Sequence, residues 1–199
     1  MSATGIATRN ETRRVARSGD QTQQRRSKAT QCIVTTMIDS PVGPLLAGAT
    51  DDGICLLEFT HGSRDERSTS ALRRWFGVSI EPGDHKWLEL LREELAEYFA
   101  GRLKKFTVPL VLRGTPFQEM AWRELSRIPF GKTISYAEQA LRIGRPTSVR
   151  AVANANGQNR IAIVIPCHRV IGKDGSLTGF GGGLWRKQLL LDLETRQPK

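Results

Sequence analysis

The 199-residue sequence contains no apolar run long enough to cross a bilayer, and its start lacks the apolar stretch of a secretory signal. We therefore expect neither a membrane protein nor an exported one. Only three cysteines are present, Cys32, Cys55 and Cys167, an odd number with wide spacing. Their spacing fits neither a disulfide framework nor a CxxC metal motif, which favours a reducing compartment, and we predict a cytoplasmic protein. We predict no metal and no other cofactor.

Positive charge is concentrated at the two ends of the chain. Residues 1–30 carry seven Lys or Arg and two acidic residues, residues 31–112 carry nine and twelve, and residues 113–199 carry fourteen and six. The net charges of these segments are therefore +5, −3 and +8. A basic C-terminal segment beside a mildly acidic one indicates a nucleic-acid-binding domain attached to a partner domain, although a generically basic protein has the same composition.

Composition and periodicity divide the first part of the chain. Residues 1–30 have almost no large apolar side chains, and we predict a disordered basic tail. In the N-terminal α/β domain, residues 31–112, apolar segments separated by turn signals predict a small antiparallel sheet, and helical spacing predicts a helix that covers one face of it. The predicted strands are Ile33–Ile38, Leu45–Ala49 and Ile54–Phe59, the helix is Lys86–Ala100, and Phe106–Leu112 is an extended connector.

Residues 113–199 are predicted to form a mainly helical domain. Periodic apolar side chains predict a helix over Phe117–Arg127. Two short helices then flank a turn at Gly144, one over Tyr136–Leu141 and one beginning near Thr147, which is a helix-turn-helix pattern. The predicted fold class is α+β, with a small N-terminal antiparallel sheet and helix followed by a helical, winged-helix-like domain.

The stretch Ile161–Val170 carries the candidate chemistry. Its five leading apolar residues predict a buried strand or core segment, which Pro166 ends. A turn at the proline would let His168 act as a base toward the Cys167 thiol, and Glu194 on a C-terminal helix can hold the other imidazole nitrogen. The alternative is an inert buried cysteine, which is the commoner fate of such a residue.

The motif Pro166-Cys167-His168-Arg169-Val170 resembles the active-site signature of the O6-alkylguanine-DNA alkyltransferase family, also called methylated-DNA-protein-cysteine methyltransferases. The resemblance extends over about Thr35–Glu194. It implies direct-reversal DNA repair, in which an alkyl group of O6-alkylguanine, and also of O4-alkylthymine, moves irreversibly onto the protein after nucleotide flipping. Its other motifs are Asp39-Ser40-Pro41-Val42-Gly43, Gly114-Thr115-Pro116-Phe117-Gln118 and Ile134-Ser135-Tyr136.

The resemblance implies a role in the transfer for five residues. Cys167 is the alkyl acceptor, His168 deprotonates it through a bridging water, and Glu194 orients the imidazole. Asn159 matches a hinge asparagine that ties the recognition helix to the active-site turn by backbone hydrogen bonds. Tyr136 matches a tyrosine that crowds the 3′ phosphate during flipping and helps to neutralise the departing guanine.

The resemblance also implies contacts with the minor groove of double-stranded DNA and a pocket for the flipped base. Arg150 is expected to fill the gap that the flipped nucleotide leaves in the base stack. Phe180 stands where many members have tyrosine, and Ala162 where some have proline. The other DNA-binding residues are Tyr136, Thr147, Ser148, Ala151 and Asn154, and the substrate pocket is formed by Val170, Phe180, Gly181 and Gly182.

The remaining expectations concern the oligomeric state of the protein, its location and its alternative functions. We expect a monomer in the bacterial cytoplasm, associated with the nucleoid, and leave cooperative binding along DNA open. A non-enzymatic lesion-binding protein would share the fold without an acceptor, which Cys167 argues against. A helix-turn-helix regulator would read an operator in the major groove. A cysteine hydrolase would use the same Cys-His-Glu arrangement but would turn over, whereas a thioether has no evident route back to the thiol.

Overall fold

The computed structural model describes residues 32–60, 70 and 72–196. These residues belong to one compact unit. The predicted disordered tail at residues 1–30 lies outside the described residues. Within the described ranges, no helix combines the length and the apolar character that spanning a bilayer requires.

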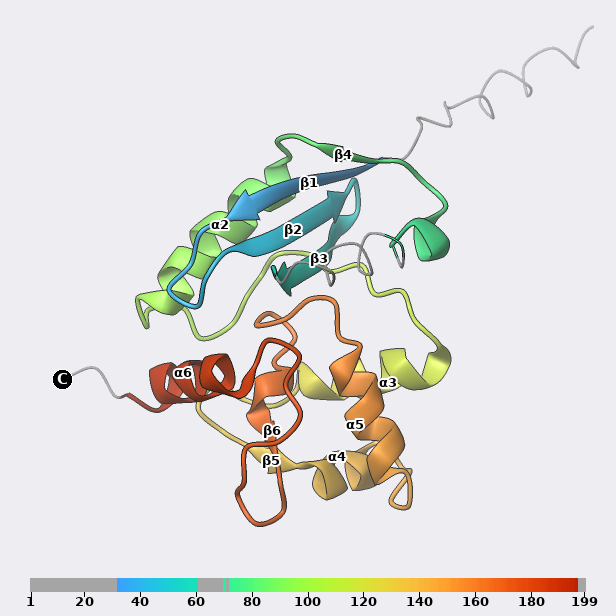
Figure 1. Ribbon diagram of the computed structural model, residues 1–199, viewed down its shortest axis with the longest axis vertical. Coiled ribbons are helices and arrows are strands. Elements are labelled where there is room, and N and C mark those ends of the chain that lie inside the picture. The colour runs from blue at the N-terminus through green and yellow to red at the C-terminus, as the bar shows by residue number, and fades with distance from the viewer. Residues whose placement is uncertain (1–31, 61–69, 71, 197–199) are drawn as a thin grey trace, which may run out of the picture. The chain divides into compact units, whose positions relative to one another are not determined.

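A four-stranded sheet forms the first half of the described chain (Figure 1). Its strands are β1 (Ile33–Ile38), β2 (Leu45–Thr50), β3 (Gly53–Phe59) and β4 (Ile80–Pro82), in the spatial order β3-β2-β1-β4. The predicted antiparallel meander of β1, β2 and β3 is confirmed by their register. The sequence does not predict β4, which pairs parallel with β1, because three residues ending in proline show no alternating pattern.

Helix α2, Lys86–Phe99, packs on one face of the sheet, as the sequence predicts (Figure 1). The His85 side chain accepts a hydrogen bond from the first turn and caps the helix. Leu91 is fully buried in the same cluster as Ala47 of β2. The helix ends because Gly101, with φ 75°, takes the left-handed conformation that glycine adopts without a steric penalty.

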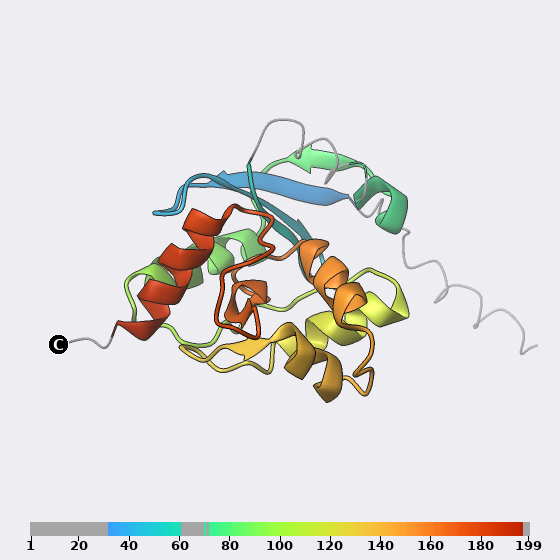
Figure 2. The ribbon, with the colours of Figure 1, turned by 60° about the horizontal axis from the view of Figure 1, so that its bottom comes forward.

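The second half of the chain places helices below the sheet, with a pair of short parallel strands among them (Figure 2). A turn with Gly144 at φ 69° separates two of these helices, which confirms the predicted helix-turn-helix pair. The bounds are Pro116–Leu125 for α3, Ile134–Ser135 for β5, Tyr136–Arg142 for α4, Val149–Gly157 for α5, Val170–Ile171 for β6 and Leu184–Thr195 for α6.

Two buried amides fasten α4 to α5. Gln139 and Asn156 exchange hydrogen bonds of 3.1 and 2.7 Å, and Gln139 Nε2 also donates to Ala121 O on α3. Trp122 Nε1 on α3 donates to Ala155 O on α5 at 2.8 Å. Leaving such groups buried without a partner costs about 1–3 kcal/mol each, so the orientation of α5 against its neighbours is well defined.

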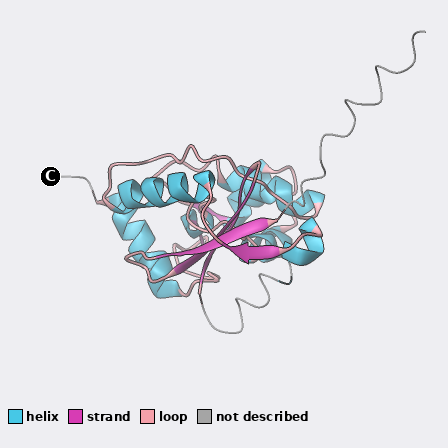
Figure 3. Cartoon of the chain, turned by 90° about the horizontal axis from the view of Figure 1, so that it is seen from above, coloured by secondary structure: helices cyan, strands magenta, loops and turns pink. Residues whose placement is uncertain are grey.

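The outer edge of β3 joins the two halves. Leu57 N–H donates to Arg160 O at 2.7 Å, and Ala162 N–H donates to Leu57 O at 2.8 Å. Ile54 forms a similar bridge with the extended connector at Leu110. Seen from above, the strands lie across the helices (Figure 3). The division of this part into two domains stays a prediction.

Candidate active site

The apolar segment before Cys167 is a buried turn, so of the two predicted forms the core segment is confirmed and the strand is not. Asn159 Oδ1 accepts a hydrogen bond from Ile161 N–H at 3.0 Å, and Asn159 Nδ2 donates to Ile165 O at 2.8 Å. Ile163 has φ 71°, a region that β-branched residues rarely adopt. The asparagine side chain satisfies backbone groups that a strand would pair, so the segment can be buried without a sheet neighbour on each side.

Cys167 begins a single 3-10 turn, η1 (Cys167–Arg169). The residue is 9% exposed, and Asn159 Nδ2 donates a hydrogen bond to its Sγ at 3.3 Å. Burial raises the pKa of the thiol above its usual value, while the Asn159 amide, the charge of Lys187 and nearby backbone N–H groups oppose the rise. The resting residue is therefore a thiol, and a base must take its proton before the sulfur becomes a strong nucleophile.

His168 and Glu194, the pair that the sequence analysis assigned to a relay, are in contact. His168 Nε2 donates to Glu194 Oε1 at 2.8 Å, and the imidazole is fully buried. Its Nδ1 is also buried and has no hydrogen-bond partner in the part of the chain that the structure describes. Burial lowers the pKa of His168, and Glu194 opposes that change. The imidazole is therefore neutral at pH 7, with a lone pair on Nδ1, which is the state a general base needs.

Glu194 is surrounded by donors. Arg169 donates to both carboxylate oxygens at 2.8 and 2.9 Å. The Tyr98 hydroxyl donates to Oε1 at 2.7 Å, and Gly131 N–H donates to Oε2 at 3.1 Å. Burial by itself would raise the pKa of Glu194, but the hydrogen bonds and charges of His168 and Arg169 outweigh it and hold the pKa at about 2. The carboxylate is therefore ionised at neutral pH and held in one orientation.

We expect the free energy of unfolding to decrease as the pH falls from 6.5 toward about 2. The folded state lowers the pKa of His168 below 6.5 and that of Glu194 from 4.5 to about 2, so the unfolded chain binds more protons in acid. The contribution of Glu194 is complete above pH 4.5 and is lost as the pH falls through about 2. Urea titrations at several pH values measure the slope. A Glu194→Gln variant whose slope below pH 4.5 equals that of the wild type would contradict the assignment.

Lys187 and Tyr136 hold the loop that follows β6. Lys187 is fully buried, and its Nζ donates to Val170 O at 2.6 Å and to Thr178 O at 2.8 Å. Burial lowers the pKa of Lys187 to about 8. The half-buried Tyr136 donates from its hydroxyl to Thr178 O at 3.1 Å. Because burial also raises the pKa of Tyr136, it is a neutral phenol that can donate a hydrogen bond at neutral pH.

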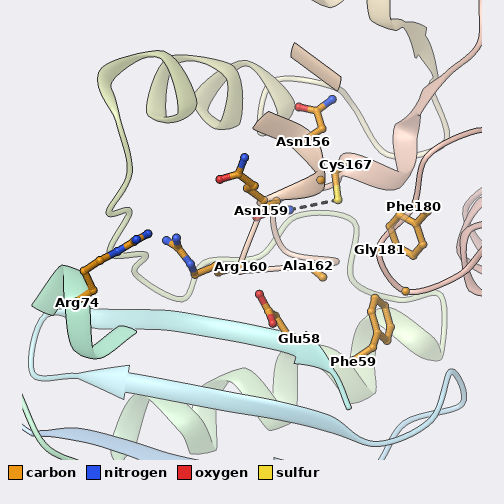
Figure 4. Close-up of a pocket in the computed structure, with 13 residues that line it drawn as sticks. Glu58, Phe59, Arg74, Asn156, Asn159, Arg160, Ala162, Cys167, Phe180 and Gly181 are labelled. Atoms are coloured by element: carbon orange, nitrogen blue, oxygen red, sulfur yellow. Dashed lines mark hydrogen bonds between the residues drawn. The ribbon is translucent and has the colours of Figure 1, made fainter. Parts of the chain in front are cut away.

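An open pocket of about 380 Å³ gives access to Cys167 (Figure 4). It lies between β3 and the turn that carries the cysteine. Figure 4 shows the sulfur directed into this space, with Phe59 and Phe180 toward one end and Arg74 and Arg160 toward the other. The pocket therefore has an apolar end and a charged end, with the thiol accessible from within it.

Three of the four residues predicted to form the pocket line it, namely Phe180, Gly181 and Gly182. Val170 is not among the residues that line it, and its contact with a bound base stays a prediction. Its side chain is fully buried, because its strand pairs with Ile134 and the segment turns the side chain into the core. Its backbone carbonyl instead accepts the hydrogen bond of the buried lysine described above.

All the predicted DNA-binding residues except Tyr136, which begins α4, lie on α5 or in the turn before it. Arg150, Ala151 and Asn154 are exposed on the helix, and Thr147 is exposed two residues before its start. Ser148 is the N-cap residue, although its side chain makes no capping hydrogen bond.

Three residues that sequence patterns did not assign to the site are brought there by the fold. Arg169 belongs to the motif around the cysteine, and its position next to His168 is the sequence feature that could have pointed to a role in the site. Tyr98 lies within the predicted helix Lys86–Ala100, whose spacing assigned it to the buried face and to no chemical role. Lys187 lies in a helix of mixed character, and lysine is almost never fully buried, so its contact with the loop could not be foreseen.

Two family models match most of the chain. The model described as "6-O-methylguanine DNA methyltransferase, ribonuclease-like domain" matches residues 33–112. The model described as "6-O-methylguanine DNA methyltransferase, DNA binding domain" matches residues 116–196.

Individual relatives agree with the family models. A methylated-DNA–protein-cysteine methyltransferase of Mycolicibacterium paratuberculosis is 47% identical over 165 residues, which cover 80% of this chain and 90% of that protein. One of Methanosarcina barkeri is 42% identical over 164 residues, which cover 79% and 94%. The crystal structure of Mycobacterium tuberculosis OGT in complex with DNA is 43% identical, with a TM-score of 0.69 and coverage of 82% of this chain and 92% of that one.

Proposed function

The chain belongs to the 6-O-methylguanine DNA methyltransferase family and repairs alkylated DNA by transferring the alkyl group to a cysteine, and we propose that Cys167 is the acceptor. One observation carries the proposal: its sulfur lines the open pocket and lies on the same 3-10 turn as a buried, neutral histidine. Cys55 is a poor alternative, because burial raises the pKa of its thiol to about 12 and the thiol donates to Gly48 O.

The transfer begins with removal of the thiol proton. His168 accepts this proton at Nδ1 through a bridging water, while Glu194 holds the opposite nitrogen and stabilises the imidazolium that forms. The thiolate electron pair then forms a bond to the alkyl carbon, and the bond between that carbon and guanine O6 breaks with its electrons moving to the base. A thioether stays on Cys167, so each molecule reacts once.

The departing guanine needs a donor, because breaking the carbon–oxygen bond leaves negative charge on the base. Tyr136 supplies a hydrogen bond to N3, and the backbone N–H of Gly181 supplies one to O6. The Tyr136 hydroxyl is bound to the loop at Thr178 in the structure and exchanges that partner for the base when substrate enters. Lys187 keeps positive charge beside the thiol, which favours the thiolate at the start of the reaction.

The base reaches the pocket by flipping, since a stacked guanine does not expose its alkyl carbon for in-line attack. Helix α5 docks in the minor groove, and Arg150 occupies the gap in the base stack. The DNA around this gap is contacted by Thr147, Ser148, Ala151 and Asn154. The protein acts as a monomer in the cytoplasm, where bacterial DNA is found.

Replacing Arg150 by alanine is expected to slow transfer from a duplex by about tenfold or more, because unstacking a base costs a few kcal/mol that the arginine offsets. Transfer from free O6-benzylguanine should be unchanged, since a free base needs no flipping. Rates of single-turnover reactions with both substrates measure the effect. Arg123→Ala on α3 removes a comparable exposed arginine and serves as the control. Equal slowing with both substrates would contradict a role in flipping.

Mass spectrometry of the intact protein and of its peptides tests the acceptor assignment. After incubation with a duplex that contains O6-methylguanine, we expect one methyl group on the Cys167 peptide and none on those of Cys32 and Cys55. The amount of modified protein should equal the number of lesions removed. A duplex with O4-methylthymine tests the second substrate class. Repair of the duplex with Cys167 unmodified would overturn the proposal.

A further inference from the structure

The apolar end of the pocket is built from both halves of the chain. Phe59, the last residue of β3, faces Phe180 in an edge-to-face contact with ring centroids 5.7 Å apart. Ala162 and Gly182 complete this end, which we call the aromatic end. In Figure 4 the aromatic rings lie on the side of the pocket opposite the arginines, and Cys167 opens into the space beside them.

The Phe59 ring is held from several directions. Arg186 on α6 places its guanidinium 5.0 Å from the ring centroid, and its nitrogens donate to Val42 O at 2.6 Å and to Gly182 O at 2.8 Å. The ring also rests directly on the loop backbone, because a Cβ atom built on Gly182 would come within 2.5 Å of it and 2.9 Å of Phe180. Phe59 is therefore only 4% exposed, and it cannot move without displacing the loop or the guanidinium.

An alkyl chain carried to Cys167 has two directions in which to extend. The charged end presents Arg74 and Arg160, and burying an apolar chain against such groups costs their hydration. The aromatic end offers apolar contact with no such cost, so chains larger than methyl extend toward Phe59.

We propose that Phe59 is a specificity-determining residue that limits the size of the alkyl group transferred to Cys167. The proposal rests on the proposed acceptor role of that cysteine. Its physical basis is that Phe59 closes the aromatic end and is held there by Arg186. A longer alkyl group would therefore clash with a ring that cannot move aside. The N-terminal sheet thus takes part in substrate selection as well as holding the turn before the cysteine.

The test compares single-turnover rates for duplexes that contain O6-methylguanine and O6-n-butylguanine. Phe59→Leu should raise the ratio of butyl to methyl rates by roughly tenfold, since a methylene or two in an apolar pocket changes discrimination by about that much. Phe59→Trp should lower the ratio. The ratio is formed within one protein preparation, so a loss of folded protein reduces both rates equally and does not change it.

Phe76→Leu is the matched control, because Phe76 packs in the second apolar cluster around Ile33 and Leu56 and does not line the pocket. Its ratio should equal that of the wild type. Unchanged ratios in both Phe59 variants, with methyl transfer to Cys167 intact, would overturn the proposal. If the wild type transferred no methyl group to Cys167, the acceptor assignment itself would fail, which is a distinct result.

Discussion

Replacing Cys167 by serine is expected to abolish alkyl transfer while leaving the binding of alkylated DNA intact. A serine hydroxyl ionises far less readily than a thiol, and its oxygen is a weaker nucleophile toward an alkyl carbon. The shape of the pocket changes little, because the two side chains differ in one atom. Transfer of a labelled methyl group should fall below detection, and a gel-shift titration with the same duplex should give a dissociation constant close to that of the wild type.

Cys32→Ser is the control for this experiment. Cys32 is half-buried at the beginning of the described chain and lines no part of the pocket. Its variant should transfer methyl groups at the wild-type rate. Residual stoichiometric transfer by Cys167→Ser, accompanied by a modified Cys55 or Cys32 peptide, would assign the chemistry to another sulfur.

Replacing Glu194 by glutamine is expected to affect both stability and transfer. The Arg169 guanidinium would lose its buried counter-charge, and removing one member of a buried ion pair costs about 3–5 kcal/mol of unfolding free energy. The imidazolium formed during transfer would also lose the charge that stabilises it, so the rate should fall by at least about a hundredfold. Urea denaturation at pH 7 and single-turnover kinetics measure the two effects.

Glu97→Gln provides a matched comparison. Glu97 pairs with Arg102 at 2.7 Å, a contact as short as those of Glu194, but both side chains are largely exposed. Exposed ion pairs contribute little to stability, so this variant should unfold and react as the wild type does. If the two glutamine variants behaved alike, burial of the Glu194 carboxylate would not be what makes it important.

Local patterns in the sequence predicted most of the regular structure. Alternating and helical spacings predicted β1, β2, β3, α2 and α3, and the turn at Gly144 separated the two predicted short helices, α4 and α5. These predictions succeeded because such elements depend on neighbouring residues and on one buried face. The short strands β4, β5 and β6 could not be predicted, since two or three residues carry no periodic signal and their partners are distant in the chain.

The conformation of the segment before Cys167 could not be predicted from local sequence patterns. Five apolar residues fit a buried strand as well as a buried turn, and the choice was made by Asn159, whose side chain binds the backbone at both ends of the segment. The docking of that turn on the edge of β3 then fixed its place. Neither contact follows from composition or spacing, because each joins groups whose approach depends on the folded chain.

The sequence by itself determined the chemical identity of the site: a cysteine followed by a histidine after a proline, a distant glutamate, and a basic helical segment to meet DNA. Only the tertiary structure decided the surroundings of these residues, namely their burial, their hydrogen-bond partners and the shape of the pocket. It buried Lys187 against the loop and surrounded Glu194 with hydrogen-bond donors from α2, η1 and the turn at Gly131. It also placed Phe59 of the N-terminal sheet in the pocket that Cys167 lines. The reason is that pKa values and pocket shape depend on burial and on long-range neighbours, which come together only when the chain has folded.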